Sequence, residues 1–312
     1  MAHHRIEPER ATLHGTYSRD FPPVLTLDPG DTVSLRTLDA GWNLEPKTPD
    51  GKRTKGFEPR VRERDWGHAL CGPIAIRGAK PGMVLGVRFD RIRPGTWGWS
   101  TAGGPFHLNE RLGVGDLPEH HMLWRLDADK GEGVNQFGHR IKLHPMMGSV
   151  GMPPDEPGLH STIPPRFCGG NIDCTELVEG TTLYLPIPVV GGLLSIGDGH
   201  AAQGDGEISG PALECPMEQV DVTLTLHEGP SLTMPRANTP AGWVSLGLHE
   251  DLHEAVVLAM NGMLDLMCEL HGLSRFEAAG LADLVVDLRV TQVVNGVRGV
   301  HALLPHGAID RV

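Results

Sequence analysis

The stretch LVEGTTLYLPIPVVGGLLSI, residues 177–196, holds two β-type apolar runs separated by turn residues. Branched and aromatic residues favour strands, and glycine and proline between such runs mark turns. Residues 23–37 (PVLTLDPGDTVSLRT) and 72–92 (GPIAIRGAKPGMVLGVRFDRI) repeat this order of strand, short turn and strand. We therefore predict three β-hairpins, with residues 176–187 pairing antiparallel to residues 188–197 in the last of them.

The composition agrees with a chain built from many short strands. Its 312 residues include 41 Gly and 26 Pro without a low-complexity repeat, which indicates frequent turns. We predict a mainly β fold in which residues 1–225 form a sandwich- or barrel-like body carrying the active site. Residues 226–312 are predicted to form a smaller α+β unit packed on that body.

The C-terminal unit has its own signals. Apolar residues recur at helical spacing over residues 251–270, which predicts a helix with one buried face. Ser274 and Glu277 form a capping box that opens a second helix. Two β-type runs flank Asn295-Gly296, which predicts a closing hairpin.

The net charge and the cysteine content limit the classes of partner and the cellular compartment that we expect. A formal net charge of -12 repels nucleic acid and anionic membranes, so neither is an expected partner. The five cysteines form no CxxC pair, which favours a reducing compartment, and we expect the cytoplasm. No apolar stretch reaches the ~20 residues of a membrane helix.

Residues 193–210 (LLSIGDGHAAQGDGEISG) crowd acidic groups into a glycine-rich stretch. Asp198 and His200 are two positions apart, as are Asp205 and Glu207, so each pair points the same way from an extended chain. A bound cation would offset the repulsion between the acids, and mixed imidazole and carboxylate ligands suit zinc and related ions. A polar loop with turn-forming Asp and Gly is the alternative.

A second cluster lies upstream, at Cys168–Cys174 (CGGNIDC), where Asn171 and Asp173 are again two apart. The predicted hairpin over residues 176–197 would return the chain to its start and place Asp173 beside Asp198. Asp173, Asp198 and His200 would then supply three ligands and leave one position open, as in a catalytic zinc site. Calcium is the alternative ion, because it prefers oxygen ligands.

A metal-dependent hydrolase also needs a group that moves protons. We predict Glu207 for this role, because neighbouring acids raise its pKa, with Glu214 as the alternative. His144 opens the long segment 144–170, which we expect to be irregular, and is a candidate ligand or substrate contact; a hydrogen-bonded loop histidine is the alternative. The segment 97–105 (WGWSTAGGP) is expected to be a second irregular connection. Cys168 as a nucleophile lacks any supporting local motif.

Several motifs together resemble the acetamidase/formamidase family. They are GDGHAAQGDGE (197–207), GGNID (169–173), PMMGSVGMPP (145–154) and DLRVTQVVNGVRGVHALLP (287–305), and they lie in colinear order over most of the chain. The resemblance implies hydrolysis of a small linear carboxamide to carboxylate and ammonia by a β-rich, homo-oligomeric enzyme that binds a divalent ion, zinc or calcium. It also implies roles for particular residues: metal ligands Asp173, Asp198 and His200, acid/base Glu207, and pocket residues Asn171, Gln203 and Asp205.

One departure and two alternatives remain open. Members of the family often carry His before the GGN motif, where this chain has Cys168, so pocket or metal choice would differ. A hydrolase of a lactam or ester bond would use the same groups. A non-catalytic β-module stabilised by a metal would show the ligands without turnover.

Overall fold

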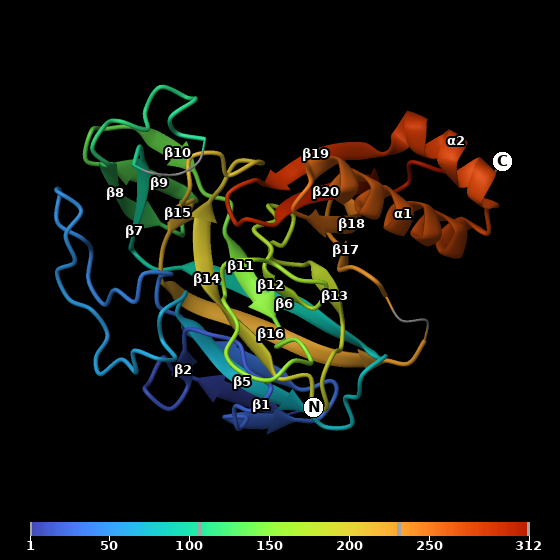
Figure 1. Ribbon diagram of the computed structural model, residues 1–312, viewed down its shortest axis with the longest axis horizontal. Coiled ribbons are helices and arrows are strands. Elements are labelled where there is room, and N and C mark those ends of the chain that lie inside the picture. The colour runs from blue at the N-terminus through green and yellow to red at the C-terminus, as the bar shows by residue number, and fades with distance from the viewer. Residues whose placement is uncertain (1, 105–107, 230–231, 311–312) are drawn as a thin grey trace.

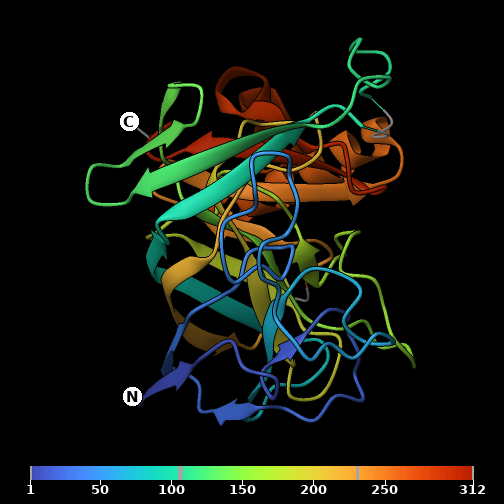
Figure 2. The ribbon, with the colours of Figure 1, turned by 90° about the vertical axis from the view of Figure 1, so that its left-hand side faces the viewer.

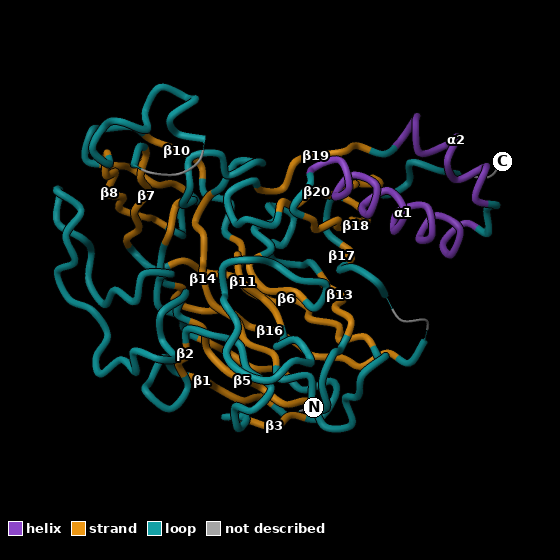
Figure 3. The backbone as a smooth tube through the Cα atoms, in the orientation of Figure 1, coloured by secondary structure: helices purple, strands orange, loops and turns teal. Residues whose placement is uncertain are grey.

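The computed structural model describes residues 2–104, 108–229 and 232–310 and consists of two large sheets with two helices at one end (Figure 1). Helix is confined to the C-terminal end, and strands and loops make up the rest (Figure 3). The view turned by 90° places the blue N-terminal strands opposite the orange and red C-terminal elements (Figure 2). The predicted mainly β body with a smaller C-terminal α+β part is confirmed.

The first sheet has nine strands and runs through both parts of the chain. Its order is β1 (His3–Ile6), β4 (Thr32–Leu35), β16 (Met217–His227), β6 (Val84–Pro94), β13 (Thr182–Pro186), β17 (Arg236–Asn238), β18 (Gly242–His249), β20 (Arg298–Pro305) and β19 (Asp287–Gln292). Strands from before and after residue 225 share this sheet. The division of the chain into units 1–225 and 226–312 therefore stays a prediction.

The second sheet has eleven strands and carries the site described below. Its main path is β10 (Arg140–Lys142), β9 (Glu132–Asn135), β8 (His120–Asp127), β7 (Trp97–Ala102), β15 (Leu213–Glu214), β14 (Leu194–Ala202), β11 (Met146–Gly151) and β12 (Gly169–Asn171). Strand β5 (Leu70–Ile76) pairs with β14 and also binds β2 (Leu13–His14) and β3 (Leu25–Leu27).

The main core lies between the two sheets. Buried side chains of β6, such as Leu85 and Val87, belong to the same cluster as Ile74 of β5 and Ile196 of β14. Burying a side chain of this size contributes roughly 1.5–3 kcal/mol. The apolar face of each sheet thus explains the alternating and continuous apolar runs of the sequence.

The three predicted hairpins are wrong. In each case the two strands of the segment belong to different sheets: β3 and β4, β5 and β6, and β13 and β14. The turns were correctly placed, but each carries the chain from one sheet to the facing one. Period-2 alternation identifies the buried face of a strand and does not identify its neighbour, so both arrangements fit the same pattern.

Two segments expected to be irregular contain strands. The stretch 144–170 includes β11 and the start of β12, and the stretch 97–105 includes β7. Pro105, at the end of that stretch, lies outside the described residues. Glycine-rich strands such as β11 (MMGSVG) lack the branched residues by which strands are recognised.

The C-terminal elements follow the prediction closely. Helix α1 (Leu252–His271) buries Ala255, Ala259, Met263, Leu266 and Met267 on one face. Helix α2 (Arg275–Val285) begins with the Ser274–Glu277 capping box, and β19 pairs antiparallel with β20. No single helix of the described chain has both the length and the apolarity to cross a membrane; α1 and α2 meet that criterion only as a pair bent by 108°.

Candidate functional site

Three neighbouring strands of the second sheet assemble the acidic groups. Strand β14 carries Asp198 and His200, and β11 lies between β14 and β12. Ser149 of β11 is opposite Gly197 on one side and Asn171 on the other. Asp173 follows β12 by two residues and therefore lies beside Asp198. The predicted proximity is correct, but strand β11 creates it and the hairpin does not.

The three expected ligands converge on one point. One donor atom each from Asp173, Asp198 and His200 lies within 4.8 Å of the others, and all three residues are buried. A second group of three, also within 4.8 Å, consists of His200, Glu207 and Glu214. The imidazole of His200 is therefore shared by two sets of carboxylates.

The backbone leaves room for this cluster at Gly148, in β11. A Cβ atom on this residue would lie 2.7 Å from Asp173 Oδ1 and 2.8 Å from His200 Cε1. The Gly148 carbonyl also accepts the backbone N–H groups of Ile172 and Asp173. Glycine is required at this position because Asp173 and His200 lie so close to its backbone, and not because of its φ angle.

Hydrogen bonds fix the orientation of the His200 ring. Its Nδ1–H donates to Gln203 Oε1 at 2.9 Å, and Gln203 Nε2 donates to the carbonyl oxygen of Asp173 at 2.7 Å. His200 Nε2 therefore faces the cavity, 3.3 Å from Glu214 Oε1 and 3.4 Å from Asp198 Oδ1. Gln203, expected to line the pocket, is instead the partner that orients the imidazole, as metal-ligating histidines generally require.

Hydrogen bonds from outside the cluster hold other oxygens of the expected ligands. Asn295 Nδ2 donates to Asp173 Oδ2 at 2.5 Å. Ser149 Oγ lies 3.1 Å from Asp198 Oδ2 and 2.8 Å from Asn171 Oδ1, and its single proton serves one of these acceptors at a time. Asn295 was recognised in the sequence only as a turn residue, and it connects the C-terminal hairpin to the site.

Three carboxylate oxygens in this cluster are buried without a hydrogen-bond partner among the described residues. They are Asp173 Oδ1, Glu207 Oε2 and Glu214 Oε2. Leaving a buried charged acceptor unsatisfied is costly, by at least about 1–3 kcal/mol for each group. A cation among them would satisfy several at once, and the donor set fits a divalent ion with mixed oxygen and nitrogen ligands.

Burial and neighbouring charges shift the pKa values of these acids in different directions. Burial, with the charge of Asp198 adding to it, raises the pKa of Asp173 to about 7. Burial also raises the pKa of Glu207 and of Glu214. Burial acts in the same upward direction on Asp198, but the neighbouring imidazoles of His68 and His200 outweigh it and leave its pKa lowered.

The pKa of His200 moves upward for a related reason. Burial alone lowers it, and the adjacent carboxylates Glu214 and Asp198 more than reverse this effect. Without another cation, the cluster therefore favours a charged imidazole. A metal ion in the cluster would take over that positive charge.

Backbone strain gathers at the same place. Asp173, Asp198 and Glu207 adopt φ angles of 51°, 58° and 46°, in the left-handed region that non-glycine residues avoid. Strain of about 1–3 kcal/mol per residue persists only where the surroundings impose it, and it is typical of functional sites.

The cluster opens into a cavity of about 400 Å³. Its walls include several residues that the sequence did not single out for the site: Lys47, His68, Trp99, Thr101, Glu119, Ile163, Val294 and Asn295. Asn171, expected to contact substrate, lines it. His144 and Asp205 do not line it; both are exposed, and Asp205 accepts a hydrogen bond from Thr175 Oγ1.

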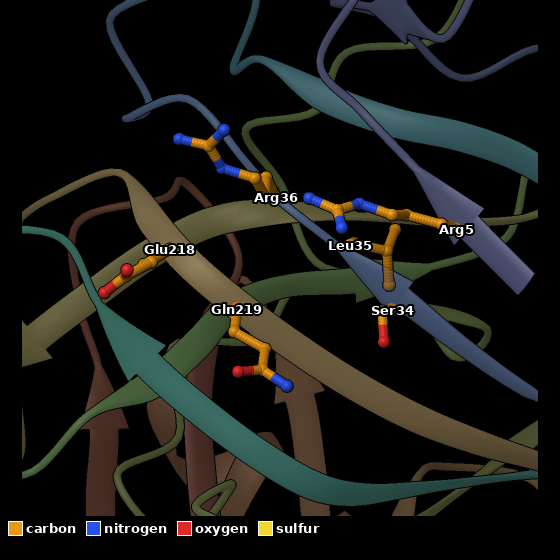
Figure 4. Close-up of a pocket in the computed structure, with 6 residues that line it drawn as sticks. All are labelled: Arg5, Ser34, Leu35, Arg36, Glu218 and Gln219. Atoms are coloured by element: carbon orange, nitrogen blue, oxygen red, sulfur yellow. The ribbon is translucent and has the colours of Figure 1, made fainter.

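A second hollow of about 420 Å³ lies on the first sheet and has a different character. Figure 4 shows its lining residues, among them Arg5 and Arg36. Both arginines pair with Glu7, at 2.5 Å and 3.6 Å. No cluster of carboxylate and imidazole donors faces this hollow among the described residues, so the site is assigned to the first cavity.

Comparison with known proteins identifies the family of the chain. The model of the acetamidase/formamidase family matches residues 2–161 and 157–235. The chain belongs to the acetamidase/formamidase family. The matched region contains Asp173, Asp198, His200, Glu207 and Glu214.

Individual relatives resemble the chain in sequence and in fold. An acetamidase of Mycolicibacterium smegmatis is 48% identical over 259 residues, 63% of this chain and 61% of that protein. Crystal structures of acetamidases from Yersinia enterocolitica and Bacillus halodurans superpose with TM-scores of 0.84 and 0.81 at 26% and 27% identity. The first match covers 99% of this chain and 93% of that one, and the second 96% and 97%. The match spans about 60% of the length of the curated relatives.

Proposed function

We propose that this protein hydrolyses the C–N bond of small linear carboxamides to carboxylate and ammonia, using a divalent metal ion. Membership of the acetamidase/formamidase family supports the reaction. The observation that carries the metal dependence is the set of three buried, unpartnered carboxylate oxygens around the imidazole of His200. A purely structural acid cluster would satisfy these oxygens with protein donors.

Asp173, Asp198 and His200 are the proposed metal ligands. Since Nδ1 of His200 is engaged by Gln203, only Nε2 is available, and the ring serves one ion at a time. An imidazole beside carboxylates favours zinc or a related transition ion, and calcium, which takes six to eight oxygens, is the alternative. A divalent ion held there supplies Lewis-acid chemistry, which polarises the amide carbonyl and makes a water molecule more acidic.

Glu207 is the proposed proton carrier. It lines the cavity, one of its oxygens has no partner among the described residues, and burial raises its pKa. A carboxyl of raised pKa can accept a proton from the attacking water near neutral pH and return it to the departing nitrogen. Glu214 Oε1 lies 3.3 Å from His200 Nε2. Glu214 is on β15, on one side of β14, and Asp173 follows β12, on the other side, so the two acids approach the imidazole from opposite sides.

One experiment addresses the metal and the reaction together. The purified protein is analysed for bound metals and assayed for ammonia release from formamide and acetamide, with a γ-lactam and a simple ester as comparison substrates. We expect about one divalent ion per chain and turnover of the linear amides that is lost on chelation and restored by metal. Bound metal without turnover of any compound would favour the non-catalytic module, and turnover without metal would refute metal dependence.

The same proposal includes the assembly and the compartment. A homo-oligomer is supported by apolar side chains on the C-terminal helices, where Phe276 is 93% exposed and Leu284 78% exposed. A cytoplasmic location is supported by the five unpaired cysteines. Light scattering of the purified protein and fractionation of the source cells test these two points.

A further inference from the structure

Lys47 is the one lysine among the described residues that lines the cavity; Asp39, Glu214 and Glu119 act on its charge, but none of them forms an ion pair with it. Its Nζ lies 3.2 Å from the centroid of the Trp99 ring. Within the described chain it makes neither an ion pair nor a hydrogen bond to another side chain. An ammonium group carries three donors and no acceptor, so a half-buried lysine of this kind has donors free for a bound molecule.

The indole of Trp99 forms a platform beneath Lys47, and hydrogen bonds hold this platform rigid. Trp99 Nε1 donates to Asp39 Oδ2 at 2.7 Å. Asp39 is fully buried and also accepts from the backbone N–H of Asn43 at 2.7 Å and from its side chain at 2.6 Å. Because these hydrogen bonds fix the indole, the cation–π contact holds the ammonium group above it in place.

Strand pairing puts this platform next to the proposed reaction centre. Trp99 of β7 is directly opposite Glu214 of β15, and Glu214 is opposite His200 of β14. Neighbouring strands are about 4.8 Å apart, so the platform and the imidazole are separated by roughly two strand spacings. A substrate with its amide at the acid cluster would therefore reach Lys47 with the other end of its chain.

The cavity is larger than the smallest amides need. Its volume of about 400 Å³ lies in the range of pockets for drug-sized ligands, about 300–1,000 Å³, whereas acetamide is little larger than a few water molecules. The walls near the platform combine apolar Ile163 and Val294 with the acid Glu119. These walls suit an extended chain. Because three acids, Asp39, Glu214 and Glu119, already act on the single charge of Lys47, a second negative charge on the substrate would be repelled.

We propose that Lys47 is a specificity-determining residue that donates a hydrogen bond to an uncharged oxygen on the acyl chain of the substrate. The preferred substrates are then linear carboxamides whose chain is longer than that of acetamide and carries a hydroxyl, ether or second amide oxygen. This inference rests on the proposed amide hydrolysis, because release of ammonia leaves the acyl chain as the part that extends toward Lys47.

The test compares three amides of similar length: pentanamide, γ-hydroxybutyramide and succinamate. The first two differ by a methyl against a hydroxyl group, and the third carries a carboxylate. We expect kcat/KM for γ-hydroxybutyramide to exceed that for pentanamide by about 10- to 100-fold, since a hydrogen bond to a charged group has this effect. Succinamate should be the poorest substrate of the three.

Substitution assigns the preference to Lys47. In Lys47→Met the ratio of kcat/KM between γ-hydroxybutyramide and pentanamide should fall to about one, and Lys47→Arg should restore part of it. Lys55→Met is the matched control, because Lys55 is exposed and pairs with Glu45 at 3.7 Å. The control should keep the wild-type ratio.

Calorimetric binding of the same pair of amides separates this inference from the proposed reaction. Amide hydrolysis with a ratio near one, or a ratio unchanged in Lys47→Met, overturns the inference and leaves the reaction standing. Binding that prefers γ-hydroxybutyramide and depends on Lys47, without hydrolysis of any amide, supports the inference and overturns the reaction. If the protein neither binds nor hydrolyses any of these amides, both the inference and the proposed reaction are overturned.

Discussion

Replacing Gly148 by alanine is the most direct perturbation of the site, because it adds one methyl group to the strand between the proposed ligands. That carbon would lie 2.7 Å from Asp173 Oδ1, 2.8 Å from His200 Cε1 and 2.9 Å from the carbonyl oxygen of Asp198. Ordinary contacts begin at about 3.4 Å, so these atoms must retreat by about 0.5–0.7 Å.

None of the three neighbours can yield freely. The Gly148 carbonyl is fixed by the N–H groups of Ile172 and Asp173, at 2.9 Å and 3.2 Å. Asp173 and Asp198 already have positive φ angles, which restricts how their backbones adjust. We expect a loss of about 1–3 kcal/mol in the free energy of unfolding, as for other overpacked positions.

The larger effect should fall on metal binding and turnover. Substitutions just outside a ligand shell typically cost 10- to 100-fold in metal affinity or activity, and a misplacement of about 1 Å can cost about 100-fold in rate. We expect Gly148→Ala to bind metal about 10- to 100-fold more weakly, as measured by competition with a chelating indicator, and to lose turnover in parallel. Circular dichroism and urea unfolding report the fold independently.

Gly204→Ala is the matched control for this substitution. Gly204 lies in the acidic loop after β14, and a Cβ there would meet no atom within 4 Å. This variant should retain the metal affinity and turnover of the wild type. If Gly148→Ala did the same, the close approach of β11 would not shape the ligand set, and the assignment of Asp173, Asp198 and His200 would be refuted.

Three further predictions test the remaining roles. Glu207→Gln should lower kcat by about 10²–10⁴-fold with metal content unchanged, and retained activity would exclude Glu207 as proton carrier. Metal affinity should weaken as pH falls through about 7, because Asp173 binds a proton there. The metal-free protein should lose stability as pH rises from 3.8 toward 7, because folding raises the pKa of Asp173 and the unfolded chain releases the proton first. Measurements of metal affinity and of unfolding against pH check the two directions. Cys168→Ser should keep near-wild-type amide turnover, because burial raises the pKa of Cys168 to about 12 and leaves its thiol protonated; loss of activity in a folded variant would reopen the nucleophile hypothesis.

The sequence predicted those parts of the fold that depend on local signals. Helix α1, the capping box at Ser274 and the β19–β20 hairpin follow from spacing and turn chemistry within a few residues. The pairing of strands was not predictable in the same way. Both runs of residues 177–196 have a buried face, and whether they face each other across the core or lie side by side depends on contacts with distant strands.

The candidate site shows the same division between local and distant information. Asp198, His200 and Glu207 could be found because a short stretch of sequence that concentrates acids and glycines is unusual in itself. Lys47 and Trp99 could not, because each is an ordinary residue in its own segment and gains its role only from the neighbours that the fold brings to it. Asn295 had a sufficient local explanation as a turn residue, which concealed its hydrogen bond to Asp173.

The order of the strands explains why fold and site are coupled so tightly. The second sheet runs through β12, β11, β14, β15 and β7. Asp173 follows β12, Gly148 leaves the gap in β11, β14 carries Asp198 and His200, β15 carries Glu214 and β7 carries Trp99. A slip of one residue in any of these pairings would turn the side chains of one strand to the opposite face and remove its group from the cavity. The core between the sheets therefore has to stabilise the register against the strain and repulsion of the acid cluster. A bound cation would lower that demand, so metal should raise the unfolding temperature as well as support turnover.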